Sequence, residues 1–379
     1  MSELAVAEAV GIKNIIGAHS NGCLLEGTAL AIGLPLFPSY IPGSQLVWNS
    51  FSYSEILLLA SLGVSDDSST FSTRVTNVLF AFLSWYQQRV LCAAAEKVMI
   101  QKLGPQITPV WETMSNMTWV LSNSEPLLDF PKPTLNKIVE IGGIGVSEAQ
   151  PLNREWSDVL DLRPATILIS FGTVAPSVYM PDGMKGSIIN VITSYPNVTF
   201  IWKYEQPDDP LFAADDRLSL FTTHGGSGSM LEAATYGKPL ILVPLFGDQT
   251  RNAKLVIKYG FGILLEKALL MESNVLREAI HKIFDEKRYR NAALRMRRML
   301  SQRVMNPKEK LVRTIQLAAE FGTIPEQLVA GRNLSFVVYY NIDLILLALL
   351  LLAISVFVIS YFILYIYRYF MSDFKAKLQ

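Results

Sequence analysis

In the second half of the chain, short apolar runs alternate with segments in which apolar residues recur at helical spacing. The short runs have the length and the branched side chains of buried strands. We expect such strands at residues 166–170, 198–204, 218–222, 239–243 and 262–265. The helical spacing predicts helices at residues 185–193, 230–234, 251–259, 275–284, 289–304 and 309–321. Strands and helices in this alternation predict an α/β fold with a parallel, doubly wound sheet.

One apolar run near the C-terminus is much longer than a strand requires. Residues 344–367 contain no charged side chain and are rich in Leu, Ile, Val, Phe and Tyr. At a rise of about 1.5 Å per residue, this run can cross a hydrocarbon core of about 30 Å. Tyrosines flank it on both sides, and the tail that follows is basic, which favours a cytosolic tail. We therefore expect one transmembrane helix at residues 342–367.

The first part of the chain has a less regular pattern. Three prolines between residues 34 and 44 predict a loop. Residues 55–62 and 78–86 are apolar but too short to cross a bilayer. We expect both segments to pack in a core, with contact to a bilayer surface as the alternative.

Composition narrows the class of function. Lys and Arg together number 33, as do Asp and Glu, so a net charge of zero gives no general attraction to nucleic acid. The basic residues within 287–303 are interleaved with apolar ones, which is typical of the solvated face of an amphipathic helix. Cys23 and Cys92 are too few for a disulfide framework, although one disulfide remains open. With only three histidines, no metal site is expected.

The segment at residues 220–252 carries the candidate chemistry. Gly225, Gly226 and Gly228 allow a tight turn and close approach of the backbone to a ligand. Ser229 is expected to cap the helix that follows. The free N–H groups and the dipole at a helix N-terminus favour a phosphate.

Side chains on both sides of this turn make the pattern more specific. His224 precedes the glycines, Glu232 lies in the helix, and Asp248 and Gln249 follow the next strand. Open α/β sheets bind ligands beyond the carboxyl ends of their strands. An ordinary strand–helix–strand unit with a glycine turn is the alternative, but it does not account for these side chains. We therefore expect a site for a nucleotide diphosphate with a sugar attached.

From about residue 5 to the C-terminus, the chain resembles the UDP-glycosyltransferases, and most closely the membrane-bound UDP-glucuronosyltransferases. The resemblance is strongest at residues 220–252 and extends to residues 121–145 and 166–173. It implies the GT-B fold, which has two Rossmann-like domains with a cleft between them. The expected parts are an incomplete acceptor-binding domain at residues 1–147, a UDP-sugar-binding domain at residues 148–325, the transmembrane helix, and a cytosolic tail at residues 368–379.

The resemblance also implies roles for individual residues. His224 and the backbone after Gly226 would hold the diphosphate, with Thr173 facing the same phosphates. Glu232 would bind the ribose hydroxyls. The donor sugar hydroxyls would be bound by the pair at residues 248–249, Asp248 and Gln249. Many members have Asn where this chain has Gly228, so a side-chain contact is lost there.

Two features of the family pattern are not found in this sequence. The family's catalytic His and orienting Asp precede the segment that matches residues 8–16, so we assign no catalytic residue and expect His19 to be structural. The family's Trp-x-Pro-Gln motif, whose Trp stacks on uracil, is absent between Tyr204 and Leu218, together with a strand. In the usual doubly wound order, that strand would lie at a sheet edge. A shortened gene model or splice form is expected to explain both differences.

The function implied by the resemblance is transfer of a sugar from a UDP-sugar to a small lipophilic acceptor hydroxyl with inversion, without a metal or cofactor. A lipid or sterol acceptor needs the same donor site. The alternative is a catalytically inactive family member that acts as a membrane-bound partner of full-length enzymes. Association with itself or with other family members, the donor sugar and the acceptor are left open.

The resemblance and the C-terminal sequence predict the location. Lys375 and Lys377 resemble the dilysine retrieval signal of endoplasmic reticulum membrane proteins. Three N-x-S/T sites, at Asn116, Asn197 and Asn333, precede the membrane helix and would face the lumen, which predicts a glycoprotein.

Overall fold

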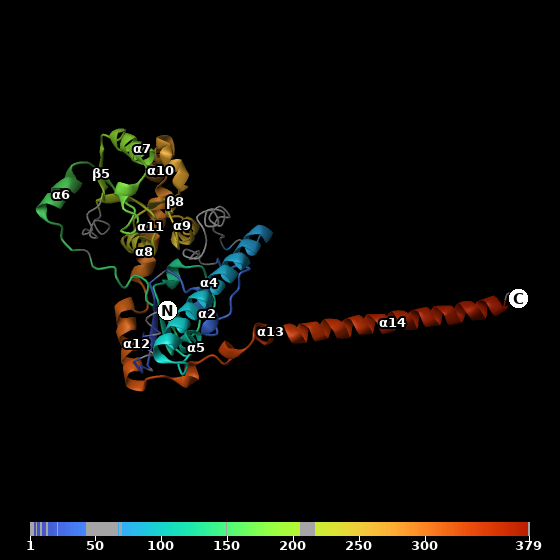
Figure 1. Cartoon of the computed structure of the whole chain (residues 1–379). Coiled ribbons are helices and arrows are strands. Elements are labelled where there is room, and N and C mark those ends of the chain that lie inside the picture. The colour runs from blue at the N-terminus through green and yellow to red at the C-terminus, as the bar shows by residue number, and fades with distance from the viewer. Residues whose placement is uncertain are drawn as a thin grey trace. The chain divides into compact units, whose positions relative to one another are not determined.

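The computed structural model describes residues 4, 6–7, 10–12, 14–20, 22–42, 67, 70–148, 150–204 and 217–377, with side chains as far as residue 368. The chain divides into two units, Met1–Leu328 and Val329–Gln379. The first unit contains two parallel sheets, each with its own helices, and is described here as a first and a second lobe (Figure 1).

The second lobe is built on a five-stranded parallel sheet with the order β5-β4-β6-β7-β8. Its strands are β4 (Ala165–Ser170), β5 (Val198–Trp202), β6 (Leu218–Thr223), β7 (Leu240–Leu242) and β8 (Gly262–Leu264). Their ends agree within two residues with those predicted from the apolar runs. The prediction of a doubly wound α/β sheet is therefore confirmed. β5 is an edge strand, which is the position where a further strand in doubly wound order would add.

Helices cover both faces of this sheet because successive strand residues point to opposite faces. Leu168 and Phe221 belong to one buried cluster, whereas Ile167 and Leu220 belong to the other. The first face is covered by α8 (Ser227–Tyr236), α9 (Gln249–Lys258) and α11 (Lys287–Ser301). The second face is covered by α7 (Asp182–Thr193) and α10 (Ser273–Asp285). Figure 1 shows these helices around the sheet, with α6 (Arg154–Asp161) preceding β4.

The first lobe has a three-stranded parallel sheet with the order β1-β2-β3. Its strands are β1 (Ile16–His19), β2 (Trp119–Ser122) and β3 (Ile138–Glu140). It also contains α2 (Glu26–Ala31), α4 (Phe71–Leu103) and α5 (Val110–Ser115). The helix α12 (Pro307–Phe321) comes after the second lobe in sequence, yet its Leu311 packs with Val139 of the first sheet. Residues 307–321 thus connect the two lobes.

The apolar segment 78–86 lies within α4, and only one of its faces is buried. Phe80 and Ala81 are buried, whereas Val78, Phe82 and Tyr86 are each more than half exposed, at 53%, 56% and 51%. The expectation that this segment packs in the core is therefore wrong for three of its eight apolar side chains. A long helix presents two faces, and a run of apolar residues does not show that only one of them has a partner. Residues 55–62 lie outside the described residues.

The second unit contains a short turn at Ala330–Asn333, α13 (Phe336–Tyr339) and α14 (Ile342–Lys377). Within α14, the stretch Ile342–Arg368 has the length and composition of one candidate membrane span. This agrees with the helix predicted at residues 342–367.

Candidate functional site

The glycine turn after β6 leads directly into α8. Gly225 has a φ of 84°, and Gly226 is the N-cap, so the helix begins at Ser227. The prediction that Ser229 caps the helix is therefore wrong, because the extended backbone of Gly226 already starts it two residues earlier. No side chain caps the first turn, so its backbone N–H groups stay available to an anion.

His224 is held between two glycines. A Cβ atom added to Gly172 would lie 2.7 Å from Cε1 of His224, and one added to Gly226 would lie 2.6 Å from Nε2. Such distances are shorter than real Cβ contacts, so both positions need glycine while the imidazole stays where it is. The hydroxyl of Thr223 lies 3.2 Å from Nδ1 of the ring. The imidazole is therefore fixed in position at the N-terminus of α8.

Burial and charge decide the protonation of His224. Burial lowers the pKa of His224 below its usual value, Asp248 opposes this, and Lys203 lowers the pKa further. The ring is therefore neutral at pH 7, so one of its nitrogens donates a hydrogen bond and the other accepts one. Lys203 follows β5 and was not predicted, although it stands beyond the carboxyl end of a parallel strand. Thr173 lies in the turn after β4, beside Gly172, and is exposed.

A cavity of ≈ 530 Å³ lies between the first lobe and α8. Gly228 and Glu232 line it from α8, and a Cβ atom added to Gly228 would meet nothing within 4 Å. His19 and Asn123 line it from the ends of β1 and β2, together with residues 143–146. Sequence reasoning missed this opposite wall, because only the fold brings it to α8.

Glu232 faces this cavity in an unusual state. Burial raises the pKa of Glu232 to about 7. Among the described residues, no ion pair involves Glu232. Because its pKa is about 7, its carboxyl group is about half ionised at neutral pH. A carboxylate that loses its water without gaining a cation is suited to accepting hydrogen bonds from hydroxyl groups of a ligand.

Asp248 and Gln249 begin α9. Oδ2 of Asp248 accepts a 3.0 Å hydrogen bond from Asn252, whose amide also donates to the carbonyl of Gly225 at 3.0 Å. Oε1 of Gln249 accepts from the backbone N–H groups of Leu245 and Phe246, at 2.7 and 2.9 Å. The side chain of Gln249 thus holds the loop after β7 through its Oε1 atom. The start of α9 is joined to the glycine turn through Asn252.

The remaining candidates are simpler. Cys23 and Cys92 are both buried and free, so the disulfide left open by the sequence is not formed. Within the described ranges, no three His, Cys, Asp or Glu side chains are close enough to hold a metal ion.

A family model described as UDP-glucoronosyl and UDP-glucosyl transferase matches residues 43–377. The putative UDP-glucuronosyltransferase ugt-60 of Caenorhabditis elegans is 27% identical over 371 residues, covering 90% of this chain and 68% of the relative. UDP-glucuronosyltransferase 1A1 of Mus musculus is 24% identical over 358 residues, covering 90% and 62%. The putative UDP-glucuronosyltransferase ugt-47 of Caenorhabditis elegans is 27% identical over 271 residues, covering 65% of this chain and 50% of the relative.

The chain spans about half to two thirds of the length of these relatives. Among solved structures, UDP-glucose: anthocyanidin 3-O-glucosyltransferase in complex with UDP is similar at a TM-score of 0.46 and 16% identity, over 57% of this chain and 58% of that one. Because the family model matches most of the sequence, the protein belongs to the UDP-glycosyltransferase family and is a UDP-glucuronosyltransferase-like member of it.

Proposed function

We propose that the protein binds a UDP-sugar between its two lobes and transfers the sugar to a hydroxyl group of a small lipophilic acceptor, with inversion at C1. The observation that carries this proposal is the imidazole of His224, fixed between Gly172 and Gly226 at the uncapped N-terminus of α8. The φ of 85° at Gly172 favours glycine for the backbone alone, whereas Gly226 has an ordinary φ and needs glycine only because of the imidazole. The two glycines are useful where an imidazole and backbone donors must reach one anion together.

The diphosphate would lie at this turn. The N–H groups of the first turn of α8 and the helix dipole favour negative charge. Lys203 adds a positive charge close enough to influence His224. As the bond to C1 breaks, charge builds up on the departing UDP, and donors that are already in position stabilise that charge without reorganising. With Nδ1 of His224 accepting from the hydroxyl of Thr223, the neutral ring carries its proton on Nε2, which can donate to the same oxygens.

The nucleoside and the sugar would extend to either side of the diphosphate. In the cavity, Glu232 is suited to the two ribose hydroxyls, and the open space beside Gly228 leaves room for them. On the other side, Asp248 and the free donors of Gln249 are suited to the sugar hydroxyls. Transfer also requires a general base for the acceptor hydroxyl, and we assign that role to no residue of this chain.

The test is turnover by the full chain in lipid nanodiscs, with UDP-glucuronate or UDP-glucose as donor and a panel of phenols as acceptors. We expect UDP release that depends on the acceptor and is lost in Asp248→Ala. UDP binding without turnover, together with association with a full-length relative, would instead support the inactive-partner function. A chain that binds no UDP at millimolar concentration would contradict the proposed transfer, and robust transfer that is lost in Asp248→Ala would contradict the inactive-partner function.

We also propose that α14 anchors the chain in the endoplasmic reticulum membrane, with the first unit in the lumen. The candidate span and the basic tail that contains Lys375 and Lys377 support this orientation. Asn197 is exposed in the turn before β5, so it is accessible for glycosylation.

A further inference from the structure

A buried ion pair joins the two lobes. Nη2 of Arg251 lies 2.6 Å from Oδ1 of Asp129, and the two side chains are 2% and 5% exposed. Asp129 follows Pro126–Leu128, between β2 and β3 of the first lobe, whereas Arg251 is in the first turn of α9 in the second lobe. We call this contact the interlobe ion pair.

Other contacts surround the same point. The guanidinium of Arg251 lies 5.2 Å above the ring of Phe130, and Nζ of Lys258 lies 5.0 Å from that ring. The hydroxyl of Tyr259 donates to the carbonyl of Asp129 at 3.0 Å. Lys132 pairs with the second carboxylate oxygen of Asp129. Residues 129–130 therefore contact side chains from both ends of α9.

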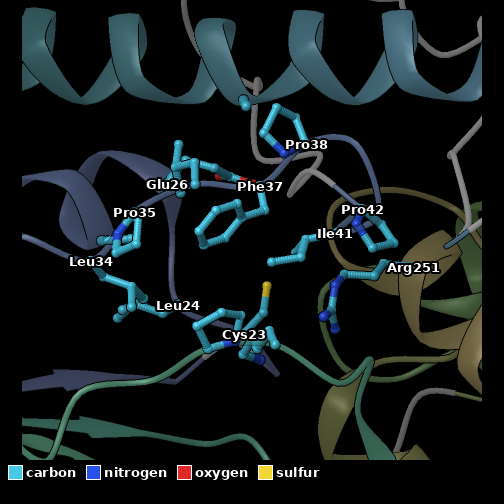
Figure 2. Close-up of a pocket in the computed structure, with 15 residues that line it drawn as sticks. Cys23, Leu24, Glu26, Leu34, Pro35, Phe37, Pro38, Ile41, Pro42 and Arg251 are labelled. Carbon is cyan, nitrogen blue, oxygen red and sulfur yellow. The ribbon is translucent and has the colours of Figure 1, made fainter. Parts of the chain in front are cut away.

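Charge keeps this pair ionised. Burial alone would raise the pKa of Asp129, but Arg251 and Lys132 outweigh it and hold the pKa below its usual value. Arg251 also lines a cavity of ≈ 60 Å³ together with Cys23 and the loop at residues 34–42 (Figure 2). Its Nη1 has no protein acceptor among the described residues. The arginine is therefore fully desolvated but not fully satisfied by protein groups.

Stability alone does not account for such a pair. Replacing a buried ion pair by apolar residues of similar size is often neutral or stabilising, because the desolvation of two charges offsets their attraction. A directional contact between two charged groups does, however, fix the orientation of the elements that carry it. The interlobe ion pair can therefore control the side chains whose positions depend on the orientation of α9.

Arg251 lies in the same turn of α9 as Asp248 and Gln249, the residues proposed for the donor sugar. The groups proposed for UDP, His224 and Glu232, lie instead on the glycine turn and on α8. Resting on the proposed function, we propose that the interlobe ion pair positions the first turn of α9 against the first lobe and thereby sets the sugar-binding residues. Asp129 and Arg251 are positioning residues for the sugar and not for the nucleotide.

This role predicts a split between two ligands. In the double variant Asp129→Leu/Arg251→Met, both charges of the pair are removed together. Outside the pair, Lys132 loses its charged partner, and its side chain is 18% exposed. We expect the melting temperature to stay near that of the wild type. The dissociation constant for UDP-glucose should rise about tenfold or more, since small misplacement of a positioned group costs at least that much. The constant for UDP should rise less, by under about threefold, because α9 reaches the glycine turn through the hydrogen bond from Asn252 to Gly225 but does not itself carry His224 or Glu232.

The matched control removes an exposed pair of the same kind. Glu309 and Arg313 pair on the surface of α12, four residues apart. The variant Glu309→Leu/Arg313→Met should leave both dissociation constants unchanged. If the interlobe double variant fails to fold, Arg251→Lys replaces it, because this change keeps the opposite charges but loses the planar guanidinium that gives the contact its direction.

Calorimetric titration of the full chain in nanodiscs with UDP and with UDP-glucose decides the matter. A double variant that loses affinity for both ligands equally, or for neither, overturns the proposal. If the wild type binds neither ligand, the proposed function fails, and amide hydrogen exchange tests the positioning role separately. Faster exchange of residues 245–252 in the double variant then supports it, and unchanged exchange overturns it.

Discussion

At the scale of single residues, the position of His224 depends on the absence of a side chain at Gly226. Gly226 has an ordinary φ of −59°, so its backbone would accept an alanine. The obstacle is the imidazole of His224, which the new Cβ atom would meet at 2.6 Å. This separates a steric requirement of the site from a requirement of the backbone.

Gly226→Ala should therefore displace His224 and weaken UDP binding about tenfold or more, since hydrogen bonds to charged phosphate are among the stronger ones. Calorimetric titration of the full chain with UDP measures this. Gly186→Ala in α7, which is outside the proposed site, is the control: its Cβ atom meets nothing within 4 Å, and UDP binding should be unaffected. Equal affinity in both variants would contradict the assigned role of His224.

Glu232 predicts an unusual dependence of stability on pH. Its pKa is raised from 4.5 to about 7 in the folded protein, so its contribution to stability is fully present below pH 4.5 and is lost as the pH rises through about 7. At about 1.4 kcal/mol per pKa unit, and discounted for partial exposure, Glu232→Gln should stabilise the ligand-free protein by about 1–2 kcal/mol at pH 8. It should have little effect near pH 4.5. Thermal unfolding at the two pH values tests this, and a variant that is destabilised at pH 8 would exclude a desolvated carboxylate.

The same carboxyl group should report on ligand binding. If ribose hydroxyls bind to the ionised form, UDP-glucose binding at pH 7 releases roughly half a proton, because about half of the free protein is protonated there. Calorimetry in two buffers of different ionisation enthalpy measures the proton release. Glu232→Gln should abolish it.

The sequence predicts those residues of the site that lie close together in the chain and misses those that lie far apart. His224, the glycines and Glu232 fall within one local unit, so their spacing alone brings them together. The opposite wall, with His19 and Asn123, comes from strand ends about a hundred residues apart, and no local pattern connects them. The sequence also does not show that Oε1 of Gln249 accepts from the backbone of Leu245 and Phe246, because an amide oxygen can accept a hydrogen bond from many different donors.

At the scale of elements, β8 shows how closely the second sheet is packed. A Cβ atom on Gly262 would lie 2.6 Å from the carbonyl oxygen of Leu240 and 2.6 Å from Cγ1 of Val256. The first atom belongs to the neighbouring strand β7 and the second to α9, so neither can move without disturbing the element that carries Asp248.

Gly262→Ala should therefore destabilise the protein by about 1–3 kcal/mol, as expected for overpacking. Gly186→Ala in α7 is the control, because its Cβ atom meets nothing within 4 Å. Alanine favours a helix over glycine by about 0.8–1 kcal/mol, so the control should be neutral or more stable. Thermal unfolding measures both, and a tolerated Gly262→Ala would show that β8 is packed less closely.

Strands and helices of the second lobe were predictable because its strands are buried on both faces and read as continuous apolar runs. The start of α8 was misjudged because a serine is a common cap, whereas a glycine cap leaves no side-chain signal in the sequence. α4 was not predicted as one helix of 33 residues. Its apolar residues occur on both faces, so no amphipathic period marks its length.

At the scale of the whole molecule, the proposed orientation places Asn197 in the lumen. This residue is exposed and begins an N-x-T triplet. Expression in mammalian cells should give a chain whose mobility increases after glycosidase treatment, and Asn197→Gln should remove one glycan. Asn274, which begins no such triplet, provides the control Asn274→Gln. A chain without any glycan would contradict the lumenal placement.

The relation between the two lobes was the part least accessible from the sequence. Resemblance implied a cleft, but the residues that close it, Asp129 and Arg251, are 122 positions apart. Their pairing is determined by the complete packing of both sheets. The cavity between the lobes has the same origin, because neither lobe forms it alone.

Hydrogen exchange of the full chain in nanodiscs, with and without UDP, tests the central claim most directly. The account predicts slower exchange on both sides of the cavity: at residues 224–232 of the glycine turn and α8, and at residues 18–20 and 141–146 of the first lobe. Protection confined to other regions, or no protection at saturating UDP, would contradict the claim that a nucleotide binds between the lobes.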